Sequence, residues 1–239
     1  MEEIVCHVTT LHPRDDIRVF FKECVSLAQR LNRRVFLVVA DGKGPSEESG
    51  VHIVDVNGKH RRGLVRRIAN AYAAYRKVLS LKPHVVHLHD PELIFVGFAL
   101  RLRGFRVVYD MHENLPKQII TKHWIPSWVR PSIAFFVKLL ERVLLPSMAV
   151  VFAEMSYSRD YPWLKNTVTV LNLPRISSLL SVAAEKKKNY SFCYVGAVST
   201  QRGGRVTLEA LAALRGKNIP VEFECVGAVE SDLAHDSLF

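Results

Sequence analysis

The hydrophobic pattern of the chain alternates between short β-branched runs and longer amphipathic stretches. The short apolar runs, which predict strands, are 4–10, 35–40, 51–56, 85–89, 106–110, 149–153 and 168–171. Apolar residues at i, i+3 and i+4 spacing predict helices over 17–31, 63–81, 93–102 and 129–145. Strands that alternate with helices indicate right-handed βαβ units and a mostly parallel sheet. We therefore predict a doubly wound α/β domain over residues 1–173.

The pattern weakens between Pro174 and Asn189, and this segment ends in the charged run EKKKN, so we predict a linker over 174–189. A strand over 192–195, a glycine-containing turn, a helix over 205–214 and a strand over 221–226 then follow. This is the opening βαβ unit of a second domain over 190–239. An independent α/β domain usually needs roughly 100 residues or more, so we expect this domain to be incomplete and the chain to stop within it.

The composition is that of a folded protein with a basic surplus. Of the 239 residues 49% are hydrophobic and 23% are charged, which excludes a disordered chain. The 33 Lys and Arg residues exceed the 23 Asp and Glu residues, and the resulting net charge of +10 indicates an anionic partner. The basic residues are interleaved with apolar ones and no aromatic platform motif appears, so we expect no nucleic acid among the partners.

Several features predict a cytoplasmic location. The four cysteines are far apart without a C-x-x-C pair, and the N-terminus lacks a basic segment followed by a long apolar core. The best candidate for a membrane span, residues 132–153, carries Lys138, Glu141 and Arg142 in its middle. Three charges at that depth are too costly for a spanning helix.

Polar residues follow three of the predicted strands. The first strand leads into a loop with His12, Arg14, Asp15 and Asp16, the strand over 85–89 leads to His89 and Asp90, and the strand over 106–110 leads to His112 and Glu113. Ligands of open parallel sheets bind beyond the carboxyl ends of the strands, so we expect these residues to line one cleft. An Asp that follows a strand is also often the N-cap of the next helix, and Asp90 or Glu92 could have only that role.

A metal ion is a further possibility for this edge of the sheet. His87 and His89 are two residues apart on a predicted strand, so they share a face and could hold a metal. No third ligand is fixed by spacing, and His87 lies inside an apolar strand. We therefore expect one packed histidine, one histidine at the edge, and no metal site.

The turn VGAVSTQRGG of the second domain has the features of a phosphate site. A strand, a turn with Gly196, Gly203 and Gly204, and a helix N-terminus together offer backbone N–H groups and the positive end of a helix dipole. Arg202 lies beside this turn and could pair with phosphate oxygens.

Four segments together carry a family resemblance. HVTTLHPRDDIRVFFKECVSLA, VVHLHDPELI, VVYDMHE and YVGAVSTQRGG occur in the order seen in retaining glycosyltransferases of family four, and the chain is similar to the branch that builds bacterial capsule and O-antigen polysaccharides. The resemblance implies the GT-B architecture, in which two Rossmann-like domains face each other across a cleft. It implies an N-terminal domain that binds the acceptor and a C-terminal domain that binds a nucleotide-diphosphate sugar.

The resemblance also implies roles for individual residues. His112 matches the catalytic histidine that faces the donor sugar, and His89 and Asp90 match a segment that lines the cleft. The loop over 12–16 takes the place of the glycine-rich loop that approaches the donor phosphate. Arg202, next to Gly203, matches the residue that grips the diphosphate, and no cofactor is implied.

The chain departs from the family pattern at several positions. Gly196-Ala197 stands where the family often has glycine-arginine, and the first loop lacks the usual paired glycines. The two donor-binding glutamates, which are separated by seven residues, lie further along a complete C-terminal domain. Glu222 and Glu230 have that spacing, but they come too early, so we interpret the spacing as coincidence.

The implied reaction is transfer of a sugar from a nucleotide-diphosphate sugar to a growing, lipid-linked glycan with retention of configuration. Because the donor site is incomplete, the chain could be inactive, and the alternative is a non-catalytic acceptor-binding module without a donor site. A lipid-linked acceptor would require the cleft to sit at the membrane face.

Two stretches predict peripheral contact with an anionic membrane. The first combines the basic residues Lys59, Arg61, Arg62, Arg66, Arg67, Arg76 and Lys77 with the apolar residues Leu64, Val65, Ile68, Ala71, Tyr72 and Tyr75. The second, over 124–145, places Trp124, Ile125, Trp128, Phe135 and Phe136 beside Lys122, Arg130 and Lys138. The alternative is that both apolar stripes pack on the sheet while the basic side chains are solvated.

Overall fold

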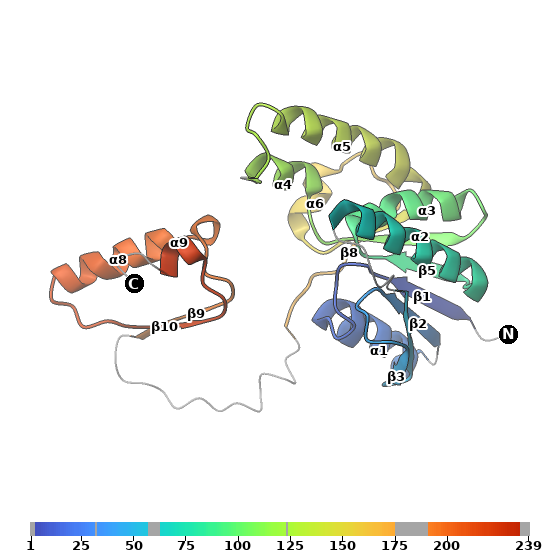
Figure 1. The fold of residues 1–239 in the computed structure, drawn as a ribbon, viewed down its shortest axis with the longest axis horizontal. Coiled ribbons are helices and arrows are strands. Elements are labelled where there is room, and N and C mark those ends of the chain that lie inside the picture. The colour runs from blue at the N-terminus through green and yellow to red at the C-terminus, as the bar shows by residue number, and fades with distance from the viewer. Residues whose placement is uncertain (1–2, 32, 57–62, 123, 175–190, 235–239) are drawn as a thin grey trace. The chain divides into compact units, whose positions relative to one another are not determined.

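The computed structural model divides the chain into two units, Met1–Pro174 and Arg175–Phe239 (Figure 1). It describes residues 3–31, 33–56, 63–122, 124–174 and 191–234. The predicted linker, except for Pro174, falls outside the described residues.

The N-terminal unit is built on one eight-stranded sheet with the order β3-β4-β2-β1-β5-β6-β7-β8. The strands are β1 (Ile4–Val8), β2 (Arg34–Val39), β3 (Ser46–Glu48), β4 (Val51–Asp55), β5 (Val85–Leu88), β6 (Arg106–Met111), β7 (Ala149–Phe152) and β8 (Thr167–Thr169). Neighbouring strands pair in parallel, except that β3 runs antiparallel to β4 at the edge. The predicted α/β class and its mostly parallel sheet are therefore confirmed.

Helices cover both faces of this sheet (Figure 1). They are the π-helix η1 (Ile17–Cys24), α1 (Val25–Arg30), α2 (Gly63–Leu81), the 3₁₀ turn η2 (Pro91–Leu93), α3 (Ile94–Arg101), α4 (Leu115–Thr121), α5 (Arg130–Leu144), the 3₁₀ turn η3 (Leu145–Ser147) and α6 (Met155–Asp160). Cys6 and Val8 of β1 pack in one core with Ala74 of α2 and Leu100 of α3. Phe20 of η1 packs in a second core with Leu37 of β2. Because successive side chains along a strand point to opposite faces, the strands contribute side chains to two cores, one on each face of the sheet.

The helical segments differ in detail from the prediction. The helix expected over 17–31 begins as the π-helix η1 and continues as α1, and the helix expected over 93–102 begins as the 3₁₀ turn η2 and continues as α3. The hydrophobic pattern does not predict β3, α4 and α6, which are three to seven residues long. Elements this short span too few turns or alternations to produce a periodic pattern.

The strand order places β1 and β5 at the point where the sheet changes direction. From β1 the chain proceeds outward to β2 and β4, and it then crosses to β5 and continues outward through β6, β7 and β8. The carboxyl ends of strands at such a switch point form a crevice in which doubly wound proteins bind their ligands. The loops after β1, β5 and β6 all begin at this edge of the sheet.

The C-terminal unit contains one βαβ arrangement. It consists of β9 (Ser191–Val195), the 3₁₀ turn η4 (Thr200–Arg202), α8 (Gly204–Gly216), β10 (Glu222–Val226) and α9 (Ser231–Ala234). Strands β9 and β10 pair in parallel, and Leu208 of α8 packs with Val198 and Leu233. Gly203, between η4 and α8, has a left-handed backbone with φ of 82°, a conformation that glycine adopts without strain. The predicted strand–turn–helix–strand order is confirmed.

A candidate active site at the carboxyl ends of β1, β5 and β6

A cavity of about 180 Å³ lies where the loops after β1, β5 and β6 meet. Its lining residues are Leu11, His12, His89, Asp90, Pro91, Tyr109, His112 and Glu113. The structure therefore brings together five of the residues singled out from the sequence, namely His12, His89, Asp90, His112 and Glu113. Their functional roles remain predictions.

Asp90 fixes the loop that follows β1. Its buried carboxylate accepts hydrogen bonds from the backbone N–H of Leu11 at 3.2 Å, from the N–H of Thr10, and from the Thr9 and Thr10 hydroxyls. Asp90 takes the N-cap position of η2, but its side chain makes no capping hydrogen bond there. The helix-cap alternative thus does not describe this carboxylate, which instead holds one wall of the cavity.

His12 and Asp16 form a second contact within the same loop. Nδ1 of His12 lies 3.5 Å from Oδ2 of Asp16, while Oδ1 of Asp16 accepts the N–H groups of Arg18 and Val19 at 2.8 Å. The hydrogen bond with His12 holds the pKa of Asp16 well below its usual range, and the same bond raises the pKa of His12. Asp16 is therefore the N-cap of η1, and it is not part of the cavity lining.

Arg14 and Asp15 lie away from the cavity wall. The Arg14 guanidinium donates to both oxygens of Asp41 at 2.7 Å, to the Ser46 hydroxyl at 2.9 Å and to the carbonyl of Gly44 at 2.8 Å. These bonds connect the first loop to the loop after β2. The hydrogen-bond donors of Arg14 are therefore already occupied by protein groups. Asp15 is exposed.

Behind His112 lies a buried ion pair that sequence analysis missed. Arg18 of η1 donates to both carboxylate oxygens of Asp110 on β6, at 2.9 and 2.8 Å. Oδ2 of Asp110 lies 3.2 Å from Nε2 of His112 and 3.4 Å from Nδ1 of His89. Burial alone would raise the pKa of Asp110, but its bonds with His112, His89 and Arg18 outweigh burial and hold that pKa far below its usual range. An ionised carboxylate thus orients the imidazole that faces the cavity.

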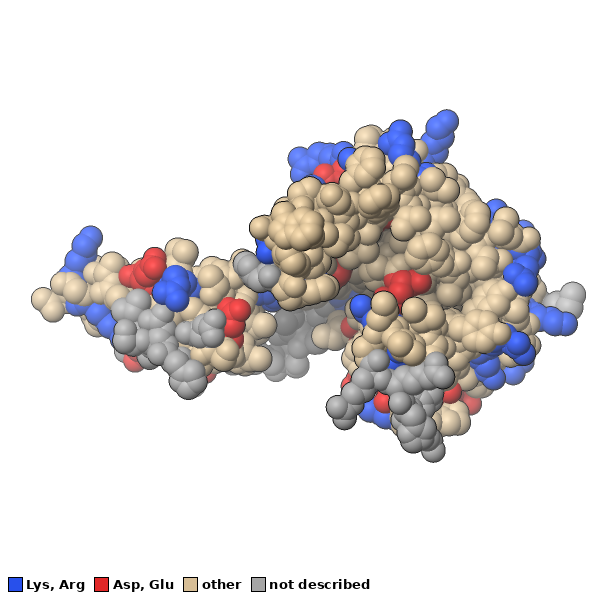
Figure 2. Space-filling view, turned by 45° about the horizontal axis from the view of Figure 1, so that its top comes forward, with Lys and Arg blue, Asp and Glu red and all other residues tan. Residues whose placement is uncertain are grey.

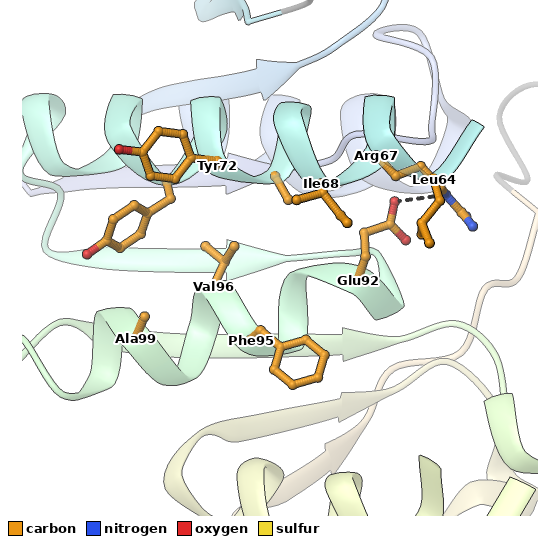
Figure 3. A pocket seen from close by; sticks show the side chains of 10 residues that line it. Leu64, Arg67, Ile68, Tyr72, Glu92, Phe95, Val96 and Ala99 are labelled. Atoms are coloured by element: carbon orange, nitrogen blue, oxygen red, sulfur yellow. Dashed lines mark ion pairs between the residues drawn. The ribbon is translucent and has the colours of Figure 1, made fainter. Parts of the chain in front are cut away.

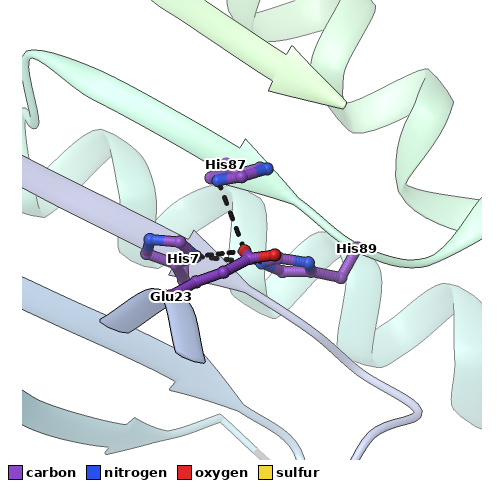
Figure 4. A group of neighbouring side chains, drawn as sticks. All are labelled: His7, Glu23, His87 and His89. Atoms are coloured by element: carbon purple, nitrogen blue, oxygen red, sulfur yellow. Dashed lines mark hydrogen bonds and ion pairs between the residues drawn. The ribbon is translucent and has the colours of Figure 1, made fainter. Parts of the chain in front are cut away.

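Beneath the cavity, three histidines surround one glutamate (Figure 4). His7 of β1 pairs in register with His87 of β5, His89 follows β5, and Glu23 reaches the group from η1. Burial lowers the pKa of His7 and lowers that of His87 and of His89 to about 3, so the three rings are neutral. Burial, together with the charge of Asp110, raises the pKa of Glu23 to about 9.

His7 and Glu23 are not among the residues predicted for the site. His7 could have been found from the period of the strand, because it lies between the core residues Cys6 and Val8 and so faces the opposite side, as His87 does between Val86 and Leu88. Glu23 had no such signal. The expectation of one packed histidine and one at the edge fits His87 within β5 and His89, which follows β5 and lines the cavity, but both rings also belong to this buried group.

Arg202 and Gly203 lie in the C-terminal unit, in the turn between β9 and α8. Arg202 is exposed, and a Cβ on Gly196 would lie 3.6 Å from its Nη1. Glu230 accepts the backbone N–H of Thr200 at 2.8 Å, so it supports this turn. Gly204 is a packing position, because a Cβ there would lie 2.6 Å from Leu233 and 3.0 Å from the Ser199 carbonyl.

An apolar groove of about 600 Å³ runs between α2 and α3 (Figure 3). Leu64, Ile68 and Tyr72 of α2 and Phe95 of α3 line it, and each is more than half exposed. At one end the Arg67 guanidinium lies 3.4 Å from Glu92, which also accepts the Thr10 hydroxyl at 3.2 Å. The alternative that this stripe packs on the sheet holds for Ala71 but not for Leu64, Ile68 or Tyr72. Lys59, Arg61 and Arg62 lie outside the described residues.

A second exposed apolar surface extends from the segment before α5 into α5 itself. Trp124 and Trp128 are 79% and 82% exposed, and Phe135 and Phe136 are also exposed, whereas Ile125 is buried. On the face of the N-terminal unit drawn in Figure 2, Lys and Arg side chains lie around the edge and uncharged side chains cover much of the middle. No helix in the described ranges is long and apolar enough to cross a bilayer.

Comparison with solved structures shows which fold the chain has. The chain resembles sucrose-phosphate synthase from Thermosynechococcus elongatus with a TM-score of 0.66 and 11% identity, covering 97% of this chain and 64% of that one. It resembles an α,α-trehalose-phosphate synthase (UDP-forming) from Burkholderia vietnamiensis with a TM-score of 0.63 and 10% identity, covering 98% and 66%. Anabaena HepE in complex with UDP and glucose matches with a TM-score of 0.58 and 15% identity, covering 96% and 63%. At these identities the likeness shows the fold, which is that of GT-B glycosyltransferases.

The sequence comparison then shows the family. The profile described as Glycosyl transferase 4-like domain matches residues 19–161, more than half of the chain, and the chain belongs to this family. A glycogen synthase from Anaeromyxobacter sp. (strain Fw109-5) is 32% identical over 82 residues, which cover 31% of this chain and 17% of that protein. The chain spans less than two thirds of the length of these first relatives.

Proposed function

We propose that this protein transfers a glycosyl group from a nucleotide-diphosphate sugar to a glycan acceptor, with retention of configuration. The observation that carries the proposal is the cavity at the switch point of the sheet, where His112, His89 and Asp90 converge in a chain of the glycosyl transferase 4-like family. In the reaction, the bond between the anomeric carbon and the phosphate oxygen breaks. A bond to the acceptor hydroxyl forms on the same face of the sugar, and the departing diphosphate takes up the hydroxyl proton.

The barrier to this reaction is the separation of charge between an oxocarbenium-like sugar and the diphosphate. His112 contacts the sugar, and the ionised carboxylate of Asp110, 3.2 Å from its Nε2, both orients the ring and favours positive charge nearby. Arg18 keeps that carboxylate charged and in place. Arg202 and the N-terminus of α8 stabilise the leaving diphosphate, because guanidinium and backbone N–H groups complement its charge.

The acceptor in this proposal is a lipid-linked glycan. The apolar groove between α2 and α3 ends at Glu92, and Glu92 is bonded to Thr10 of the loop that forms the cavity wall. A lipid chain in the groove would therefore place a polar head group toward the cavity. The exposed arginines of α2, Arg66, Arg67 and Arg76, favour an anionic surface next to the groove.

The test is turnover of nucleotide-diphosphate sugars by the purified chain. Turnover is measured as the release of nucleoside diphosphate. His112→Ala should lower turnover by roughly a hundredfold or more, as expected for the loss of one transition-state contact. His52→Ala is the matched control, because His52 lies on β4 and pairs with Glu47 away from the cavity. Unchanged turnover in His112→Ala would overturn the assigned role, and acceptor binding without any nucleoside diphosphate release would identify a non-catalytic acceptor-binding module instead.

A further inference from the structure

We infer that His7, Glu23, His87 and His89 form a binding site for a divalent transition metal, with zinc as the best match. The site lies beneath the cavity and joins β1, η1 and the end of β5. It does not depend on the proposed glycosyl transfer.

The four side chains already converge on one point (Figure 4). Oε2 of Glu23 lies 3.8 Å from Nδ1 of His7, 3.8 Å from Nδ1 of His87 and 3.9 Å from Nε2 of His89. Nδ1 of His7 and Nε2 of His89 share a hydrogen bond of 3.0 Å, which metal binding would replace, and all four ligand atoms lie within 4.8 Å of one another. In a tetrahedral zinc site with bonds of about 2.0–2.1 Å, ligand atoms are about 3.3 Å apart. The three distances from Glu23 to the rings would therefore shorten by about half an ångström when a metal ion binds.

The surroundings leave the central carboxylate oxygen unsatisfied. Oε2 of Glu23 is buried, and within the part of the chain that the structure describes it has no hydrogen-bond partner, as is also true of Nε2 of His7 and Nε2 of His87. The separations of 3.8 to 3.9 Å are too long for hydrogen bonds, so the three rings surround this oxygen without satisfying it. A buried polar atom without a partner is costly, and a cation at the centre would remove that cost for Glu23.

The donor set suits zinc in type. Imidazole nitrogens and carboxylate oxygens are both common zinc ligands, and this group offers three of the first and one of the second. The other nitrogen of His89, Nδ1, lies 3.4 Å from Asp110, so a metal ion on Nε2 would complete a carboxylate–histidine–metal arrangement. Oε1 of Glu23 lies 3.1 Å from Arg18 Nε, which positions the carboxylate.

The consequence for the fold is a cross-link at the switch point. The metal would tie η1 to the two central strands and would fix the ring of His89, which also lines the cavity. We therefore assign it a structural role. The ligands in this site come from three elements that are far apart in the sequence, which explains why spacing alone did not reveal it.

The experiment uses the full chain after treatment with a chelator. Addition of Zn²⁺ should load about one ion per chain, and Co²⁺ in its place should give the intense visible bands of tetrahedral coordination. Glu23→Gln and His87→Ala should each weaken metal affinity by about a hundredfold or more, since they remove a ligand rather than a supporting group. His52→Ala, on the surface of β4, should leave metal affinity unchanged.

Two further measurements distinguish this site from the neighbouring group of His89, Asp110 and His112, which could also gather around an ion. His112→Ala should retain the metal, because His112 belongs only to the neighbouring group. X-ray absorption of the Zn²⁺-loaded wild-type chain should show scattering from three imidazoles, a result that does not depend on whether a variant folds. Failure of the wild-type chain to take up Zn²⁺ or Co²⁺ stoichiometrically, or uptake that Glu23→Gln and His87→Ala leave intact, would overturn the inference.

Discussion

Arg18 and Asp110, which are 92 residues apart in the sequence, form a buried ion pair in which Nε and Nη2 each reach one carboxylate oxygen. The two side chains are 4% and 0% exposed. Loss of either partner leaves an uncompensated buried charge, so Arg18→Ala and Asp110→Ala should each lower the free energy of unfolding by about 3–5 kcal/mol. Urea denaturation should show that the double variant costs clearly less than the sum of the two single variants.

The control for this pair is Arg33, whose guanidinium lies 2.9 Å from Glu3 with both side chains about half exposed. Arg33→Ala should change the free energy of unfolding by about 0–1 kcal/mol, because water screens the pair. Additive effects of Arg18→Ala and Asp110→Ala would show that the two side chains do not act as a pair.

Asp90 should govern the order of the loop that follows β1. Asp90→Ala removes the acceptor of the Thr10 and Leu11 N–H groups, and this should cost about 1–3 kcal/mol of stability. Hydrogen exchange of these two amides should accelerate in the variant, while exchange in β6 changes less. Asp15→Ala, in the same loop but exposed, serves as the control. Equal protection of the Thr10 amide in Asp90→Ala and the wild type would contradict the assignment.

The sequence was enough to predict at which edge of the sheet the site forms. It was not enough to predict the buried residues beneath the cavity. His12, His89 and His112 follow three strands, and parallel strands bring such residues to one edge regardless of how the helices pack. Arg14 does not line the cavity but pairs with Asp41, and nothing in the sequence indicates that partner. Asp41 comes 27 residues later, after β2, and no periodicity or spacing relates the two.

Glu23 and Arg18 show why the buried groups were missed. They are five residues apart, which places them on different sides of an α-helix, but η1 is a π-helix with i to i+5 hydrogen bonding. In η1 both side chains face the sheet, where Arg18 Nε lies 3.1 Å from Glu23. Nothing in the local sequence signals this widening, and the groups that the two side chains meet, His7 and Asp110, lie on β1 and β6.

Glu141 provides a pH dependence of stability that is separate from the site. Its buried carboxyl accepts the Tyr161 hydroxyl at 2.9 Å, and burial raises its pKa to about 7. Between pH 4.5 and 7 the folded state binds the proton more strongly than the unfolded chain does. The contribution of Glu141 to the free energy of unfolding is therefore fully present below pH 4.5 and is lost as the pH rises through 7. The total decrease is at most about 3 kcal/mol.

Glu141→Gln keeps an acceptor for Tyr161 but cannot ionise. Thermal unfolding followed from about pH 5 to about pH 8 should therefore show a smaller decline for Glu141→Gln than for the wild type, with the variant the more stable of the two at the upper end. Glu47→Gln, on the exposed edge strand β3, is the matched control. Parallel pH profiles for Glu141→Gln and the wild type would show that Glu141 does not titrate in this range.

The groove between α2 and α3 supports the prediction that the protein binds anionic membranes. Vesicles that contain anionic lipid should sediment the protein at about 0.1 M salt, because each arginine of α2 near the surface contributes about 1 kcal/mol. Sedimentation should fall at about 1 M salt, where the Debye length shrinks from about 10 Å to about 3 Å.

Ile68→Gln and Phe95→Gln should weaken binding without loss of stability, since both side chains are already exposed. Leu102→Gln removes an equally exposed apolar side chain outside the groove and should leave binding unchanged, so equal losses in all three variants would point to general surface hydrophobicity. Equal sedimentation with neutral and anionic vesicles, or none at low salt, would exclude the arginines of α2 as the contact surface.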